Sequence, residues 1–284
     1  MQKIDTVSVI GAGTMGNGIA HVMALHGCKV NLIDTQEAAL LKAMETIKKN
    51  LERQHQKNII DKSQIEKSLN NIQIFNDIKI GVTAADLVIE AVTENKEIKK
   101  EIFKLADQSA PINCILASNT SSISISELAE ITSRPGKVIG MHFMNPVPVM
   151  KLVEIIEGKN GSKETTDTII ALTHQLGKTP CVVKDAPGFI SNRILMPMIN
   201  EAILALEEGI GDAKTIDEIM KVGMAHPMGP LQLADYIGLD VCHNILCILE
   251  EGFKNDKYHP AKMLTEKVQA GKLGTKSGEG FYKY

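Results

Sequence analysis

The sequence predicts an α/β fold in which a doubly wound parallel sheet precedes a smaller all-α domain. Three observations support this prediction. Short apolar runs alternate with helical patterns in the first half of the chain, a glycine-rich turn joins the first run to the first helix, and strand-like alternation is absent beyond residue 185. Alternating strands and helices imply right-handed crossovers, and therefore a parallel sheet.

The predicted strands of the first domain are short and apolar throughout. We expect them at residues 6–10, 29–33, 86–90, 115–118, 138–143 and 151–156. Continuous apolar runs are typical of strands that are buried on both faces of a sheet. Helical patterns lie between them at residues 14–26, 36–57 and 95–109. Asn95 stands where the third helix begins and is the residue type that caps helix N-termini.

The pattern changes at Asp185, which opens the turn signal Asp-Ala-Pro-Gly. Apolar residues then recur at helical spacing up to Leu206, and Gly209 and Gly211 end that helix. Further helices are expected near residues 214–222, 230–238, 240–251 and 260–270. We therefore predict one domain at residues 1–185 and a mostly helical one at residues 186–284.

Composition excludes several classes of protein. The 284 residues carry a net charge of −3, and aromatic residues make up 4% with no Trp, which argues against a nucleic-acid binder. The five cysteines are scattered without a CxxC pair, as in a reducing cytoplasm. No segment resembles a secretion signal or approaches the roughly 18 apolar residues of a membrane span. No His shows metal-ligand spacing, so no metal is expected.

A dinucleotide-binding fingerprint follows the first predicted strand. It reads Gly11-Ala-Gly13-Thr14-Met15-Gly16, opens a helix, and is followed by Asp34 at the end of the second strand. Its glycines allow a tight turn and a close approach of the backbone to a pyrophosphate. Asp34 would accept hydrogen bonds from ribose hydroxyls and repel a 2′-phosphate. The first domain is therefore a Rossmann-type domain that favours NAD, with NADP the alternative.

His142 and Glu154 are candidates for acid–base chemistry. His142 ends a predicted strand, and ligands of α/β sheets bind beyond the carboxyl ends of strands. Glu154 is a charged residue within an apolar strand, which is costly unless the charge is paired. The proline-rich loop between them allows the two strands to lie side by side. Taken singly, each residue is more often structural, and only their pairing favours a catalytic dyad.

Two further polar segments lie near expected edges of the domains. Ser118-Asn-Thr-Ser121-Ser follows a strand end, where it is either a simple turn or a set of substrate contacts. Asn192 lies just inside the first helix of the second domain, although Asn is only a modest helix former.

Six segments together resemble the L-3-hydroxyacyl-CoA dehydrogenase family, most closely its bacterial 3-hydroxybutyryl-CoA branch. They are GAGTMGNGIA, SNTSS, MHFMNPVPVMKLVEI, DAPGFISNR, HPMGPLQLADYIGLD and KSGEGFYKY, and they extend over nearly the whole chain. The resemblance implies hydride transfer between NAD(H) and C3 of an acyl-CoA, in the interconversion of acetoacetyl-CoA and (S)-3-hydroxybutyryl-CoA.

The resemblance also implies roles for single residues. His142 would be the acid and base, Glu154 would orient it, and Asn192 would polarise the reacting 3-oxygen. Ser121 would lie beside both substrate and nicotinamide. The remaining family contacts to NAD correspond to Glu94, Lys99, Asn145 and Lys276.

A basic face on the second predicted helix bears on the CoA moiety. Lys49, Arg53 and Lys57 are four residues apart and share one face, which is usually only a solvated surface. The resemblance instead implies a basic helical hairpin inserted in the first domain, with Lys57 and Asn50 as CoA contacts. It further implies a homodimer, or a dimer-based oligomer, formed through the helical domain.

Two other functions stay open at this stage. One is a dehydrogenase of the same architecture that acts on a hydroxy acid without CoA. The other is a catalytically silent, nucleotide-binding structural protein. The basic helix and the His-Phe-Met-Asn-Pro segment count against the first, and intact His142, Glu154 and Asn192 count against the second.

Overall fold

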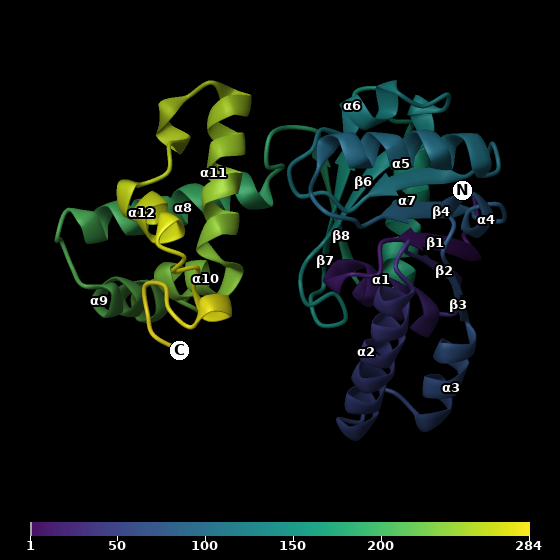
Figure 1. The fold of residues 1–284 in the computed structure, drawn as a ribbon, viewed down its shortest axis with the longest axis horizontal. Helices are drawn as coiled ribbons and strands as arrows, with labels where there is room; N and C mark the ends of the chain where they lie inside the picture. The colour runs from purple at the N-terminus through teal and green to yellow at the C-terminus, as the bar shows by residue number, and fades with distance from the viewer. Residues whose placement is uncertain (1) are drawn as a thin grey trace. The chain divides into compact units, whose positions relative to one another are not determined.

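The computed structural model describes residues 2–284, which divide into two compact units. The first unit extends to Asp185, and the second runs from Ala186 to Tyr284 (Figure 1). Each unit has its own hydrophobic core.

The first unit is built on an eight-stranded sheet with the order β3-β2-β1-β4-β5-β6-β7-β8. The strands are β1 (Thr6–Ile10), β2 (Lys29–Ile33), β3 (Ile72–Phe75), β4 (Leu87–Glu90), β5 (Ile115–Ser118), β6 (Val138–Phe143), β7 (Leu152–Glu157) and β8 (Thr179–Lys184). Strands β1 to β6 are parallel to one another and follow the order of the dinucleotide-binding fold. β7 returns antiparallel to β6, and β8 runs parallel to β7.

Helices cover this sheet and extend beyond it. They are α1 (Thr14–Leu25), α2 (Glu37–Gln56), α3 (Lys62–Asn70), α4 (Ile78–Gly81), α5 (Lys96–Ser109), α6 (Ile125–Glu130) and α7 (Lys163–Gln175). Helices α2 and α3 form the hairpin that projects from the purple edge of the unit (Figure 1). The α/β class, the parallel sheet and the helical second unit agree with the sequence-based expectation.

Local sequence explains where these helices begin. The Asn95 side chain accepts hydrogen bonds from the Glu97 and Ile98 backbone amides, as its position before α5 predicts. Asp61 and Gln64 form a capping box at the start of α3. The strands follow from their apolar runs, and all residues of β4, β5 and β6 are buried.

The second unit is helical. It comprises α8 (Ser191–Glu207), α9 (Ala213–Glu218), α10 (Pro230–Ile237), α11 (Leu239–Phe253) and α12 (Lys262–Gln269). Asp235 is fully buried on α10, and its carboxylate accepts the backbone amides of Phe281 and Tyr282 at 2.8 Å and the Tyr284 hydroxyl at 3.1 Å. These contacts attach residues 281–284 to the helical core.

Within residues 2–284, no helix combines the length and the apolar character needed to cross a membrane. Across the same residues, no three His, Cys, Asp or Glu side chains are grouped so as to hold a metal ion.

Candidate active site

The glycine fingerprint forms the tight turn between β1 and α1. Gly11 has a φ of +104°, and its amide donates to the Ile33 carbonyl at 2.7 Å. A Cβ at Gly16 would lie 1.7 Å from the Gly11 carbonyl oxygen, so only glycine permits this approach of helix and strand. A Cβ at Gly13 would meet no atom within 4 Å, so the turn is open on that side.

The open side of the turn suits the phosphates of a dinucleotide. Gly13 is the N-cap of α1 without a side-chain hydrogen bond, and the first turn of α1 has no acidic residue. The positive end of the helix dipole is therefore not neutralised within the helix, and its backbone amides are directed at the space beside Gly13. Thr14 and Met15 are the first two residues of α1. The residues present thus fit NAD.

Asp34 is fixed beside this turn. Its Oδ2 accepts the Ala12 amide at 2.9 Å and its Oδ1 accepts the Gln36 amide at 3.0 Å. The two contacts hold the carboxylate at the end of β2, next to the fingerprint. This is where the ribose of a bound dinucleotide lies in a sheet of this topology.

A cavity of about 430 Å³ adjoins the fingerprint. Its walls come from the turn before α1, from α1 and α2, and from the loop that joins β6 to β7. The cavity is lined by three residues expected to contact the cofactor, Gly13, Thr14 and Asn145. It is also lined by Asn50, which is expected to contact CoA. Lys57 lies at the C-cap of α2 with an exposed side chain and does not line this cavity.

His142 and Glu154 form a buried pair on neighbouring strands. They are register partners in the antiparallel β6–β7 pair, and His142 Nδ1 lies 3.1 Å from Glu154 Oε2. The other ring nitrogen, Nε2, lies 3.0 Å from Ser121 Oγ. The imidazole thus lies between a carboxylate and a hydroxyl at the carboxyl end of β6. The sequence analysis expects the carboxylate partner but not the contact with the hydroxyl. An ionised Glu154 can only accept, so it fixes the Nδ1 proton and leaves Nε2 for proton exchange.

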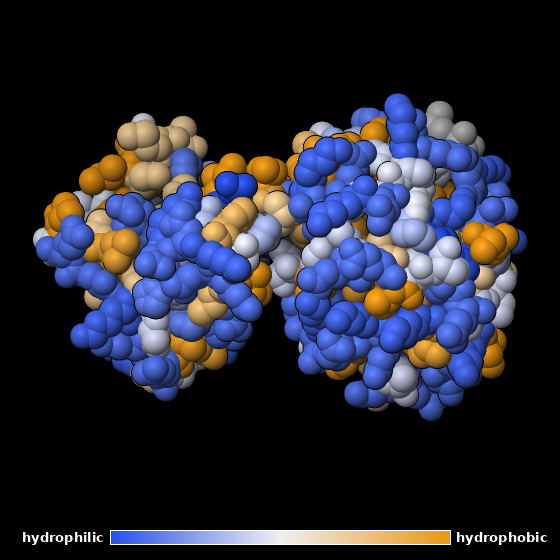
Figure 2. Space-filling view, turned by 90° about the horizontal axis from the view of Figure 1, so that it is seen from above, coloured by the Kyte–Doolittle hydropathy of each residue, from blue (hydrophilic) through white to orange (hydrophobic). Residues whose placement is uncertain are grey.

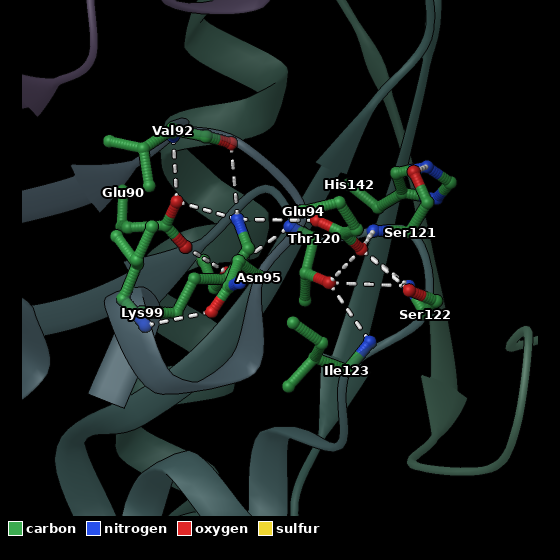
Figure 3. A network of polar contacts seen from close by, with 12 residues as sticks. Glu90, Val92, Glu94, Asn95, Lys99, Thr120, Ser121, Ser122, Ile123 and His142 are labelled. Atoms are coloured by element: carbon green, nitrogen blue, oxygen red, sulfur yellow. Dashed lines mark hydrogen bonds and ion pairs between the residues drawn. The ribbon is translucent and has the colours of Figure 1, made fainter. Parts of the chain in front are cut away.

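Glu94 fixes the segment that carries Ser121. Its Oε1 accepts the Thr120 hydroxyl at 2.5 Å, the Ser121 amide at 3.0 Å, and the Ser122 amide and hydroxyl at 3.1 and 2.7 Å (Figure 3). Burial acts to raise the pKa of the Glu94 carboxyl. The Lys99 charge and the hydrogen bonds from residues 120–122 outweigh burial and hold this pKa below its usual range.

Lys99 is buried behind Glu94, with a side chain that is 1% exposed. Its ammonium lies 2.6 Å from Glu90 Oε1, 3.3 Å from Glu94 Oε2 and 3.4 Å from the Val92 carbonyl. The assignment of Lys99 as an NAD contact stays a proposal.

Two predicted site residues belong to the second unit. Asn192 is buried at the second position of α8. Lys276 is exposed in the short turn at Thr275–Ser277 and forms an ion pair with Asp240. Their roles stay proposals that rest on the resemblance.

The sequence analysis missed two residues that shape the site. Glu90 is a fully buried carboxylate at the end of β4, and the signal that singled out Glu154, a charge in an apolar strand, applies to it equally. Lys178 is also buried, and its ammonium donates to the carbonyls of Val147 and Met150 at 2.6 Å each. Burial, and then the charge of Lys151, lowers the pKa of Lys178 to about 8. Lys178 thereby fastens the loop between His142 and Glu154, and no pattern in the sequence indicates this.

Comparison with known proteins covers both units. Residues 6–186 match the family model of the 3-hydroxyacyl-CoA dehydrogenase NAD-binding domain, and residues 188–284 match that of the C-terminal domain. The chain is 48% identical over 282 residues to a probable 3-hydroxybutyryl-CoA dehydrogenase of Bacillus subtilis, covering 99% of this chain and 98% of the relative. It is 42% identical to the human mitochondrial hydroxyacyl-coenzyme A dehydrogenase, covering 99% and 91%. The crystal structure of (S)-3-hydroxybutyryl-CoA dehydrogenase from Ralstonia eutropha superposes with a TM-score of 0.96 at 47% identity, covering 99% of each chain.

Proposed function

The chain belongs to the 3-hydroxyacyl-CoA dehydrogenase family, and on that premise we propose that it interconverts acetoacetyl-CoA and (S)-3-hydroxybutyryl-CoA with His142 as acid and base. It is an NAD-dependent oxidoreductase. The observation that carries the proposal is the buried His142, which contacts Ser121 and Glu154. It lies at the carboxyl end of β6, and the fingerprint follows the carboxyl end of β1 in the same parallel sheet.

Proton transfer is the part of the reaction that this chain's side chains perform. Bound NADH supplies the hydride that reduces C3 of the substrate. Protonated His142 donates from Nε2 to the oxygen on C3 as negative charge develops there, and in oxidation the neutral ring takes that proton back. Glu154 accepts from Nδ1 throughout, so it keeps the tautomer fixed and stabilises the imidazolium.

Ser121 and Asn192 are proposed to hold the substrate oxygen. The Ser121 hydroxyl lies 3.0 Å from Nε2, so a substrate oxygen that approaches the ring comes within reach of both groups. The Asn192 amide would polarise the same oxygen, as the family resemblance implies.

Asp34 supports NAD over NADP as the cofactor. Two backbone amides hold its carboxylate in place, so a 2′-phosphate at the adjacent ribose would meet a fixed like charge. Glu94, Asn145 and Lys276 are proposed to complete the cofactor site.

The CoA moiety is proposed to bind along the α2 helix. Asn50 lines the 430 Å³ cavity beside the fingerprint, and Lys57 is exposed at the C-terminal end of the same helix. The cation at Lys57 would pair with a CoA phosphate.

The second unit supports a homodimer or a dimer-based oligomer. Apolar side chains are visible on its surface (Figure 2), and Ile194 is 66%, Ile210 75% and Val222 75% exposed. Association of two copies through this unit would cover such side chains, as is usual in symmetric oligomers. Light scattering at micromolar concentration tests this point, and a particle of 30.9 kDa would contradict it.

A cytoplasmic location is proposed from the thiols. All five cysteines are free, and three of them are buried. Such thiols persist in a reducing compartment.

One assay separates the proposed reaction from its two rivals. Purified protein is mixed with NADH or NADPH and either acetoacetyl-CoA or free acetoacetate, and NADH absorbance is followed. We expect rapid oxidation of NADH with the CoA ester alone. Equal rates with free acetoacetate would indicate a dehydrogenase that does not recognise CoA, and no oxidation with either would indicate a silent nucleotide-binding protein. A series of longer acyl chains then gives the preferred length.

A further inference from the structure

Glu90 connects three separate segments through one buried carboxylate. Its side chain is 1% exposed at the end of β4. Oε1 accepts the Val92 amide at 2.7 Å and the Lys99 ammonium at 2.6 Å, and Oε2 accepts the Ser118 hydroxyl at 2.6 Å (Figure 3). The loop after β4, helix α5 and the end of β5 are thereby fixed to one residue.

The first route from Glu90 leads through Ser118. Glu90 and Ser118 are register partners in the parallel β4–β5 pair. An ionised carboxylate has no hydrogen to give, so the Ser118 hydroxyl must donate to Glu90. Its oxygen is then directed at the Thr120 amide, from which it accepts a hydrogen bond at 3.1 Å. Glu90 thus fixes the orientation of the Ser118 hydroxyl, which in turn holds the Thr120 amide.

The second route leads through Lys99 and Glu94. Lys99 lies between the two carboxylates, so Glu90 limits how far the ammonium can shift toward Glu94. Glu94 Oε2 faces Lys99, which leaves Oε1 to accept the Ser121 amide. The two routes therefore end on consecutive backbone amides, those of Thr120 and Ser121.

The segment at these amides is held by hydrogen bonds, among them those that Thr120 Oγ1 accepts from the Ser122 and Ile123 amides and those that Glu94 accepts. Residues 119–123 lie outside helix and strand, so side chains set their path. Ser121 Oγ lies 3.0 Å from His142 Nε2, and a displacement of its backbone moves this hydroxyl directly.

We propose that Glu90 is a positioning residue that sets the Ser121 hydroxyl against His142 through Ser118 and through Lys99 and Glu94. The proposal rests on the reaction proposed above, because it assigns Ser121 to the reacting centre. Buried ion pairs contribute little net stability compared with apolar packing. The geometry that Glu90 imposes therefore accounts for its place better than stabilisation does.

The test compares Glu90→Gln with a matched control, Asp107→Asn. Both changes remove a carboxylate charge from an ion pair that α5 helps to form. The control pair, Asp107 with Arg134 at 2.7 Å, is only partly buried and makes no contact with residues 120–122 in the described structure. Ser118→Ala is the milder second variant, because it removes a single hydroxyl from the first route. Thermal unfolding shows that each variant is folded before its kinetics are measured.

We expect Glu90→Gln to lower kcat by about 10- to 100-fold, the effect of a sub-ångström to 1 Å misplacement in a reacting centre, with the KM for acetoacetyl-CoA changed less than about twofold. Ser118→Ala should lower kcat by a smaller factor, and the double variant should be no worse than Glu90→Gln because both act on one segment. Asp107→Asn should lower Tm while kcat stays within about twofold. An equal loss of kcat in the control, or an unchanged kcat in Glu90→Gln, would overturn the proposal.

A structural readout separates this proposal from the proposed reaction. Crystal structures of Glu90→Gln and Asp107→Asn give the distance from Ser121 Oγ to His142 Nε2, whichever substrate the enzyme takes. We expect this distance to exceed hydrogen-bonding range in Glu90→Gln and to stay near 3.0 Å in Asp107→Asn. An unchanged distance in Glu90→Gln would refute the positioning role even if the wild-type enzyme reduces acetoacetyl-CoA. A lengthened distance in that variant would support the role even if the wild type does not reduce acetoacetyl-CoA.

Discussion

His142 and Glu154 face each other directly across the antiparallel β6–β7 pair, with Nδ1 and Oε2 3.1 Å apart and the two residues 12 positions apart in the chain. Directly opposed residues of an antiparallel pair have their Cβ atoms about 5 Å apart, which suits an imidazole–carboxylate contact. Both strands have a paired neighbour on each side in the sheet, and the contact is buried.

Replacing His142 tests the acid–base role. His142→Asn keeps a polar side chain but cannot exchange a proton near neutral pH, so we expect kcat to fall by about 10²–10⁴-fold. The affinity for NADH, measured by fluorescence titration, should change little because the fingerprint lies on β1 and α1. A variant with near wild-type kcat would assign the proton transfer to another group.

Replacing Glu154 tests whether the pair acts as a unit. Glu154→Gln keeps the volume and one hydrogen bond but removes the counter-charge of the imidazolium, so reduction should be impaired. The double variant should be little slower than His142→Asn alone, because Glu154 acts through His142. Losses that simply multiply in the double variant would show that the two residues work independently.

Two fingerprint glycines should respond differently to replacement by Ala. One variant should lose stability, and the other should lose affinity for NADH. Gly16→Ala should destabilise the fold by about 3 kcal/mol or more, because its Cβ would overlap the Gly11 carbonyl. Gly13→Ala should unfold at the wild-type temperature, since its Cβ meets no protein atom, yet raise the KM for NADH about tenfold by obstructing a phosphate contact. Calorimetry and kinetics check both, and an unchanged KM in Gly13→Ala would place the phosphates elsewhere.

Asp34 should determine cofactor choice. Asp34→Arg should raise the ratio of kcat/KM for NADPH to that for NADH, because the charge beside the ribose changes sign. Asp34→Gly should raise the KM for NADH by loss of the ribose partner. Glu37→Arg is the matched control, since it makes the same charge change at an exposed residue in the first turn of α2. If the control shifts the ratio as much as Asp34→Arg does, the shift comes from the changed charge of the surrounding surface, and Asp34 does not contact the ribose.

His21 should make the protein acid-sensitive. Burial, only partly offset by the hydrogen bond to Gln54, lowers the pKa of His21 to about 4 from 6.5. Between these values the unfolded chain takes up a proton that the folded chain does not, so stability falls as pH drops from 6.5 to 4, by on the order of 3 kcal/mol. Urea unfolding of His21→Gln should show a shallower acid loss than wild type. The exposed His174→Gln should leave the slope unchanged.

The sequence predicts elements where local signals are strong. The start of α5 follows from the Asn95 cap and the central strands from their apolar runs. Strands β3 and β8 escape detection. They lie at the two ends of the sheet, where half of the residues of β3 and most of those of β8 are exposed. Gln73 interrupts the apolar residues of β3, and those of β8 form only a short run between polar residues, so pairing with the neighbouring strands reveals them.

The same distinction applies to the site. The pairing of His142 with Glu154 is predictable because a short loop joins their strands, and each residue stands out in the sequence, His142 at a strand end and Glu154 as a charge within an apolar strand. The partner of Lys99 is not predictable. Helical spacing places Lys99 on one face with Ile102, Phe103 and Ala106, which are buried, but it does not show that the ammonium meets Glu90 there.

The antiparallel return of β7 has a consequence for the order of folding. The His142–Glu154 contact closes over 12 residues within one hairpin, whereas Asp34 reaches Ala12 over 22 residues and Ser118 reaches Glu90 over 28. Parallel partners also require a complete crossover before they can pair, while a hairpin does not. During refolding the His142–Glu154 pair therefore needs only a contact between residues close in sequence. The fingerprint turn and the Ser121 segment need contacts between residues far apart in sequence. Recovery of dehydrogenase activity accordingly reports when the parallel sheet is finished, and says little about when the hairpin forms.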